Sequence, residues 1–230
     1  MQFASLKVTF LASAILAMFS TFSGRSDAAT VPFNNGSFEN GTTGRPTGTV
    51  NGTRFSNLLT GGPGWDIYST VKDWKTKTGS GVEVQSDRNP ATLDAQAGDY
   101  YVSLDGLSNA SIEQKVKLAA GTYILSFWYS PQTTLAATNS IGYNLGNIVS
   151  GQVTAGTNGA RVGIWTEIRT TFVVLSRNNY DLLFSARGAS DGIGGFIDNV
   201  TIETVPVPAA GLALLTGLFG LVGMRRRRRA

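Results

Sequence analysis

The sequence predicts an all-β protein, a jelly-roll β-sandwich at residues 30–204, flanked by an N-terminal signal peptide and a C-terminal single transmembrane helix. The region between the two apolar ends is rich in Gly, Thr, Ser and Asn and has no long helical periodicity. Its apolar residues alternate over short segments that turn residues separate, which is typical of strands in a sandwich. No internal repeat is found, so about 175 residues are expected to form one domain.

Residues 1–29 are predicted to be a secretory signal peptide. Lys7 supplies the positive charge, residues 8–22 form the apolar segment, and small residues allow cleavage after Ala28 or Ala29. An uncleaved N-terminal membrane anchor is the alternative, which the short apolar segment disfavours. We therefore expect export through the Sec translocon.

Within the domain, the clearest strand is residues 111–118. Its even-numbered side chains are mostly apolar and its odd-numbered ones are polar, which predicts a strand with one solvated face. Residues 122–129 are β-branched and aromatic throughout, as expected of a central strand. Six further strands are predicted at residues 100–105, 140–145, 148–153, 165–175, 180–187 and 196–203. Eight to ten strands in one chain suit a jelly roll.

The C-terminal end, residues 205–230, has three parts in a fixed order. A short Pro-containing motif occupies residues 205–210, and an uncharged apolar stretch at 207–224 is just long enough to span a bilayer as a helix. The basic cluster at 225–229 follows, and clustered arginines stay cytoplasmic, so the domain is expected to face outward. The five basic residues of this cluster are Arg225, Arg226, Arg227, Arg228 and Arg229.

This order of motif, helix and basic cluster resembles the PEP-CTERM family of sorting signals, in its VPxPA form. The matching motif residues are Val205, Pro206, Pro208 and Ala209. The resemblance implies processing by an exosortase-type membrane enzyme in a bacterium that makes exopolysaccharide. Val207 departs from the best-known form, which has Glu between its two prolines. The alternative is a C-terminal anchor in the inner membrane that is never cut.

A second set of motifs extends over residues 31–204. NGSFE (35–39) begins it, PGW (63–65), GDYYVSLDG (98–106), IEQ (112–114) and GTY (121–123) follow, and GGF (194–196) and IDNV (197–200) end it. Their order resembles that of the galactose-binding-like jelly rolls found in many carbohydrate-binding modules. The resemblance implies a β-sandwich that binds polysaccharide.

The same resemblance implies a structural Ca²⁺ held by Glu39 near the first strand and by Asp198 in the last. Asp198 shares its parity with Phe196, Val200 and Ile202, so we expect its side chain to face inward, where a carboxylate must be paired or coordinated. Calcium takes six to eight oxygen ligands, so loop carbonyls would have to contribute. The alternative is that Asp198 accepts hydrogen bonds from turn amides and Glu39 is solvated.

Four tryptophans are candidates for stacking on a sugar ring, because an apolar pyranose face packs on an exposed aromatic side chain. Trp74 and Tyr68 lie in loop-like sequence and are the predicted ligand-binding residues. Trp128 and Trp165 lie in strand-like sequence and are expected in the core. A buried Trp74 is the alternative.

Composition excludes several classes of function. The absence of cysteine and histidine excludes disulfides, thiolate metal sites, Ser-His-Asp catalysis and imidazole bases. Seven of the nineteen basic residues lie in the signal region and the tail, so the domain carries twelve basic and fourteen acidic residues. A nucleic-acid-binding domain needs a basic patch, which this charge does not predict.

Catalysis by two carboxylates stays open, since glycoside hydrolysis requires nothing else. Asp66 with Glu83, or Asp73 with Glu83, are the pairs considered, but no spacing selects either. The sequence therefore predicts a non-enzymatic protein of the cell surface or extracellular matrix that binds polysaccharide. The alternatives are a structural or adhesive surface protein without a glycan site, and a secreted glycoside hydrolase.

Overall fold

The computed structural model describes residues 28–39, 64–86 and 93–206 with their side chains. Strands β1 (Thr42–Pro46), β2 (Thr49–Val50) and β3 (Thr53–Arg54) are described by their backbone. The signal peptide up to residue 27, the apolar helix, Pro208, Ala209 and the five arginines lie outside the described residues, and their predictions stay untested. No helix among the described residues is long and apolar enough to cross a membrane.

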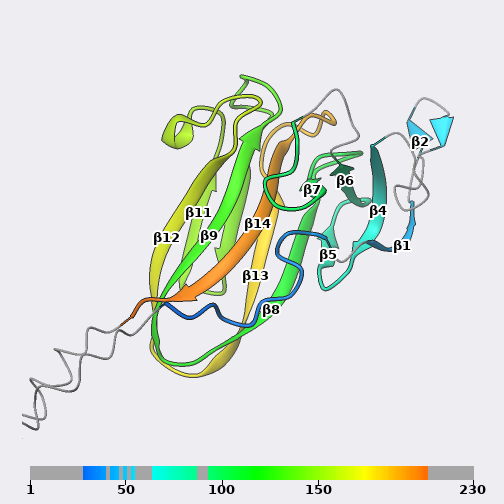
Figure 1. Cartoon of the computed structure of the whole chain (residues 1–230). Helices are drawn as coiled ribbons and strands as arrows, with labels where there is room; N and C mark the ends of the chain where they lie inside the picture. Colours follow the sequence, from blue (N-terminus) through cyan, green and yellow to red (C-terminus); the bar gives the residue numbers. More distant parts are fainter. Residues whose placement is uncertain are drawn as a thin grey trace, which may run out of the picture. The chain divides into compact units, whose positions relative to one another are not determined.

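Residues 30–205 form a compact unit that is an all-β sandwich of two antiparallel sheets. The seven-stranded sheet has the order β1-β4-β6-β7-β14-β9-β12, and the five-stranded sheet has the order β11-β10-β13-β8-β5. Figure 1 shows β12, β9 and β14 side by side in one layer. The strands of the larger sheet besides β1 are β4 (Trp65–Val71), β6 (Val82–Ser86), β7 (Tyr100–Ser103), β9 (Gly121–Pro131), β12 (Thr166–Val174) and β14 (Gly195–Thr204). Those of the smaller sheet are β5 (Lys75–Thr78), β8 (Ser111–Leu118), β10 (Ile141–Leu145), β11 (Val149–Val153) and β13 (Asn178–Ala186).

All eight predicted strands are present, with ends that differ by two residues or fewer. The alternation at 111–118 is confirmed, because the even-numbered side chains of β8 are buried and Lys115 and Lys117 are exposed. In β12 the alternation also holds, with Ile168, Phe172 and Val174 buried. Strands β1 to β6 were not predicted. Strand β4 is largely buried on both faces and has no polar-apolar alternation, so periodicity did not indicate it.

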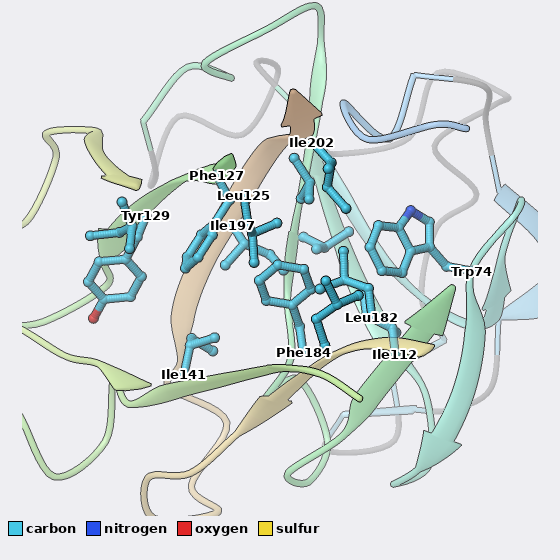
Figure 2. Close-up of a cluster of buried hydrophobic side chains, with 14 of the residues drawn as sticks. Trp74, Ile112, Leu125, Phe127, Tyr129, Ile141, Leu182, Phe184, Ile197 and Ile202 are labelled. Atoms are coloured by element: carbon cyan, nitrogen blue, oxygen red, sulfur yellow. The ribbon is translucent and has the colours of Figure 1, made fainter. Parts of the chain in front are cut away.

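The hydrophobic core lies between the two sheets. Side chains from β9 and β14 of one sheet meet side chains from β8, β10 and β13 of the other, and Figure 2 shows Phe127 and Ile197 among them. Phe127 makes edge contacts with Phe184, at a ring-centroid distance of 5.0 Å, and with Tyr143, at 5.2 Å. Edge contacts of this kind stabilise aromatic cores beyond area burial alone.

The last strand ends where the predicted sorting motif begins. The backbone N–H of Val205 donates to the carbonyl of Thr122 at 2.8 Å, next to the pair Thr204 and Tyr123 of the β14–β9 ladder. Of the predicted motif, the structure describes Val205 and Pro206. These two residues directly follow strand β14.

Candidate functional site

The predicted ligand-binding residues Trp74 and Tyr68 are both buried, so the prediction that they form an exposed stacking platform is wrong. Their exposed fractions are 3% and 1%. Figure 2 shows the Trp74 ring among the core side chains. A sugar stacks only on an accessible aromatic face, and these two rings pack against protein instead.

Trp74 is buried because its turn directs it inward. Asp73 adopts φ +66° between β4 and β5, and the Trp74 ring then packs on Phe33 and Phe184 at centroid distances of 5.6 and 6.0 Å. The indole N–H donates to the carbonyl of Asn35 at 2.9 Å, which satisfies the one polar group of the side chain. Trp74 and Thr76 alternate with Lys75 and Lys77, a strand pattern that sequence reasoning missed.

The prediction that Trp128 and Trp165 lie in the core is also wrong. Both are half-buried, and neither belongs to the cluster between the sheets. Trp165 packs edge-on against Tyr101 at 5.5 Å, and its indole N–H donates to the carbonyl of Asp94 at 2.8 Å. Trp128 lies beside Asp198 in the β14–β9 ladder, on the outer face of the seven-stranded sheet.

Asp198 is fully buried, but on the face opposite to the predicted one. Its neighbour Ile197 points into the core, so Asp198 points away from it. The register of β14 against β9 shifts between Asp198 and Thr201, where Asn199 adopts φ +46°. This β-bulge puts Val200 and Ile202 in the core and breaks the parity on which the prediction depended.

Asp198 and Glu39 together hold residues 96–100 on the sheet. Asp198 Oδ2 accepts hydrogen bonds from the backbone N–H groups of Gln96 and Ala97 at 2.8 and 3.0 Å. Glu39 Oε1 accepts from the N–H groups of Asp99 and Tyr100 at 2.9 and 2.8 Å. The first half of the alternative, that Asp198 binds turn amides, is confirmed, whereas Glu39 binds the same segment rather than solvent alone.

These two residues do not fit a calcium site as the structure arranges them. The groups that face their oxygens are N–H donors, which repel a cation, whereas Ca²⁺ requires six to eight oxygen ligands. Among the described residues no three acidic side chains come together to hold a metal ion. Burial, together with a smaller effect of the negative charge of Glu39, raises the pKa of Asp198 to about 7, although its three backbone hydrogen bonds lower it. The geometry therefore favours the alternative, in which Asp198 accepts hydrogen bonds from turn amides, over bound calcium.

Sequence reasoning missed a pair of carboxyl groups, the half-buried Glu83 and the buried Asp105. Burial raises the pKa of Glu83 to about 7, and the nearby charge of Asp105 adds to this effect, while Gln85 donates a hydrogen bond that opposes it. Burial also raises the pKa of Asp105. The pair considered from sequence, Asp66 with Glu83, is not formed, because Asp66 opposes Val84 in the ladder and Glu83 points to the other face.

An open pocket of about 320 Å³ lies on the five-stranded sheet, over β10, β11 and β13. This volume falls within the range of about 300–1,000 Å³ that small-molecule sites occupy. The residues that carry its chemistry are Gly142, Asn144, Gly151, Gln152, Ser185 and Arg187. Gln152 and Ser185 flank Gly142 in the two ladders, so they point to the same face of the sheet as Gly142 does.

Gly142 makes room in this pocket, whereas Gly151 makes room on the opposite face of the sheet. A Cβ atom on Gly142 would lie 2.9 Å from Nε of Arg187, so the absent side chain lets the arginine lie across the strand. A Cβ atom on Gly151 would lie 2.2 Å from the Tyr143 hydroxyl oxygen, so the second glycine accommodates that ring. The Tyr143 hydroxyl bonds with the Thr170 hydroxyl at 3.0 Å.

Several hydrogen-bonding groups line the pocket. Asn144 and Gln152 offer amide donors and acceptors, Ser185 a hydroxyl and Arg187 a guanidinium. Gln152 is oriented by its hydrogen bond to the Ser140 hydroxyl at 2.6 Å. A ligand rich in hydroxyl groups matches this set, because each hydroxyl can both donate and accept. No local sequence pattern indicates the pocket, since three strands contribute to it.

Comparisons with known proteins show what the fold is similar to, but they do not show the function. No protein-family profile matches the sequence, and neither does any curated protein. A Stig cyclase from Fischerella sp. TAU, solved with (3Z)-3-(1-methyl-2-pyrrolidinylidene)-3H-indole, matches 79% of this chain and 100% of its own, with a TM-score of 0.53 and 14% identity. That identity shows a common fold alone.

Two carbohydrate-binding modules are also similar in backbone. TmCBM61, solved with beta-1,4-galactotriose, matches 58% of this chain and 90% of its own, with a TM-score of 0.45 and 20% identity. A family 35 carbohydrate binding module from Clostridium thermocellum matches 58% and 94%, with a TM-score of 0.42 and 17% identity.

Proposed function

We propose that this chain is an exported, non-enzymatic surface protein whose sandwich binds polysaccharide through the pocket on the five-stranded sheet. The observation that carries the proposal is the pocket itself. It is open, of suitable volume, and its lining includes amide, hydroxyl and guanidinium groups beside the side chains of Tyr143 and Leu183. The order of motifs in the sequence, which resembles galactose-binding-like jelly rolls, supports the same function.

Export and sorting form the second part of the proposal. The signal-peptide pattern at 1–29 and the tail at 205–230 support passage through the Sec translocon, then anchoring in the inner membrane, then recognition by an exosortase-type enzyme. The final location that we propose is the cell surface or the extracellular matrix.

Binding can be tested with the full chain in detergent, by affinity electrophoresis in gels that contain soluble polysaccharides. We expect one or more polysaccharides to retard the protein, and Gln152→Ala to weaken the retardation. Ser150, Gly151 and Gln152 lie on the edge strand β11, so this change is expected to leave the fold intact. The matched control is Gln132→Ala, which changes the same kind of side chain in the loop after β9.

Other outcomes favour the alternatives. No retardation in any gel would favour a structural or adhesive protein without a glycan site. Release of reducing ends from a polysaccharide, abolished by Glu83→Gln or Asp105→Asn, would favour the hydrolase. We do not expect such turnover, because Asp105 is buried to 1% exposure and Gly106 packs over Glu83.

A further inference from the structure

The guanidinium of Arg187 has no ion-pair partner among the described residues. Three salt bridges join side chains of the described residues, and none of them includes Arg187. No hydrogen bond from its side chain to another described residue is found either. Lys77 and Lys115, on the same sheet, pair with Glu113 and Asp181 at 3.3 and 2.6 Å. Arg187 therefore contributes an uncompensated positive charge to the pocket.

The position of Arg187 is defined by its surroundings. Its backbone N–H donates to the carbonyl of Ser140 at 2.8 Å, which fixes the end of β13 against the start of β10. Its side chain lies over Gly142, with Ser185 on the same face. A guanidinium held this way presents two parallel N–H donors, the geometry that matches a carboxylate.

The same face carries further positive charge away from the pocket. Strands β5, β8 and β13 carry on this face four lysines against two acidic residues, which are Lys75, Lys77, Lys115 and Lys117 against Glu113 and Asp181. In the β13–β8 ladder Lys115 and Lys117 oppose Asp181 and Asn179, six and eight residues before Arg187, so they lie roughly 20 and 26 Å from it along the strands. These separations exceed the Debye length of about 8 Å at physiological ionic strength, so the lysines act on an approaching polymer and not on the pocket itself. The face is thus basic, although the domain has two more acidic than basic residues.

We propose that the pocket selects an anionic polysaccharide, one whose sugar units carry carboxylates, and that Arg187 binds one of these carboxylates. This inference rests on the proposed function, because it names the class of ligand for the same site. Asn144, Gln152 and Ser185 then contact hydroxyls of the unit, and the lysines of β5 and β8 attract the polymer as it approaches.

The experiment compares polygalacturonate with the same polymer after chemical reduction of its carboxyl groups to alcohols. Affinity electrophoresis of the full chain in detergent is run with each polymer at low and at physiological salt. We expect the dissociation constant for polygalacturonate to rise tenfold or more on reduction of the polymer, since a hydrogen-bonded ion pair is lost. Binding to polygalacturonate is also expected to weaken with salt.

Variants assign the effect to Arg187. We expect Arg187→Ala to weaken polygalacturonate binding about tenfold or more, and Arg187→Lys to weaken it as well, because lysine lacks the two-pronged geometry. Gly142→Ala is expected to displace the arginine and weaken binding while the melting temperature changes little, since the side chain that must move is flexible. Arg177→Ala, an exposed arginine in the turn between β12 and β13, is the matched control and is expected to bind as the unchanged chain does.

Three outcomes would overturn the inference, and each contradicts a different part of it. Equal binding of the reduced and unreduced polymers would overturn anionic selectivity and leave the proposed function standing. Equal losses for Arg187→Ala and Arg177→Ala would show attraction by net charge without a site. Failure of every polysaccharide to bind would overturn both this inference and the proposed function.

Discussion

At the scale of single residues, burial decides the chemistry of the acidic side chains. Glu83 and Asp105 come from β6 and from the end of β7, and no salt bridge among the described residues includes either. Oδ1 of Asp105 is buried without a hydrogen-bond partner in the described structure, and so is Oγ of the nearby Ser103. A buried carboxyl group without a cation is more stable when it is protonated.

This arrangement predicts a pH dependence. The pKa of Glu83 is raised from 4.5 to about 7 in the folded protein, so the folded state binds a proton more tightly than the unfolded state does. The resulting stabilisation is complete below about pH 4 and is lost as the pH rises through 7. Asp198, with a pKa of about 7, acts in the same direction.

We therefore expect the contribution of Glu83 to make the melting temperature fall between about pH 5 and pH 8. Thermal melts of Glu83→Gln should show a smaller fall, because glutamine does not titrate. Asp94→Asn, which changes an exposed carboxyl group, is the control and should keep the original slope. An unchanged slope in Glu83→Gln would contradict the prediction.

Trp74 gives a second prediction at this scale. Trp74→Ala removes a buried ring and its hydrogen bond to Asn35, so we expect it to lower the free energy of unfolding by about 3–5 kcal/mol. Trp74→Phe keeps a ring and should lose less. Denaturant titration measures both. If Trp74→Ala kept the stability of the unchanged chain and lost polysaccharide binding, this result would contradict a core role for Trp74 and support the stacking role predicted from sequence.

At the scale of elements, the segment 93–99 shows how a loop is held on a sheet. Asp198, Glu39 and Trp165 bind its backbone, and Asn199 donates to the side chain of Gln96 at 2.7 Å. Every one of these anchors comes from a part of the chain more than fifty residues away. Sequence reasoning selected Glu39 and Asp198 as a pair, but for a metal ion rather than for this segment.

The anchoring role predicts the effect of losing Asp198. In Asp198→Ala the N–H groups of Gln96 and Ala97 lose their acceptor, so we expect hydrogen exchange at these two amides to accelerate. The expected loss of stability is about 1–3 kcal/mol, since these part-buried donors lose their acceptor. Exchange of Ile168 and Phe172 amides in β12 should change only with global stability. Unchanged exchange at Gln96 and Ala97 would contradict the anchoring role.

The same geometry predicts the response to metal removal. We expect EDTA to leave the melting temperature unchanged, because N–H donors already satisfy the oxygens of Asp198 and Glu39 that would have to bind the ion. A drop on chelation that Ca²⁺ reverses and Mg²⁺ does not would show that calcium displaces these hydrogen bonds, as the sequence resemblance implied.

At the scale of the whole molecule, the end of the sandwich and the start of the predicted sorting motif coincide. Val205 makes a backbone hydrogen bond to Thr122 beside the end of the β14–β9 ladder, and Pro206 has no N–H to continue it. Removal of the chain beyond the motif would therefore leave every described strand intact.

This arrangement gives a prediction about the mature protein. Intact-mass measurement of protein from its native bacterium should show a chain that begins after Ala28 or Ala29 and lacks Arg225–Arg229. The control is the same measurement in cells without an exosortase-type enzyme, where the basic cluster should remain. Native protein that keeps all five arginines would contradict processing and favour a permanent anchor.

The sequence by itself determined the fold class and most strands. Alternation with period two is a local property, so residues 111–118 and 165–175 could be recognised as strands before their partners were known. The charge count and the apolar ends likewise depend on composition alone, and they predict export and sorting without a tertiary structure.

Only the tertiary structure decided which side chains meet. The burial of Trp74, the pairing of Glu83 with Asp105 and the pocket around Arg187 all depend on which strands are neighbours and on which face each residue lies. A single bulge at Asn199 reversed the face predicted for Asp198, because one extra residue changes the parity of everything beyond it. The binding site differs from the predicted one for this physical reason: long-range strand pairing assembles it, and no local pattern records that pairing.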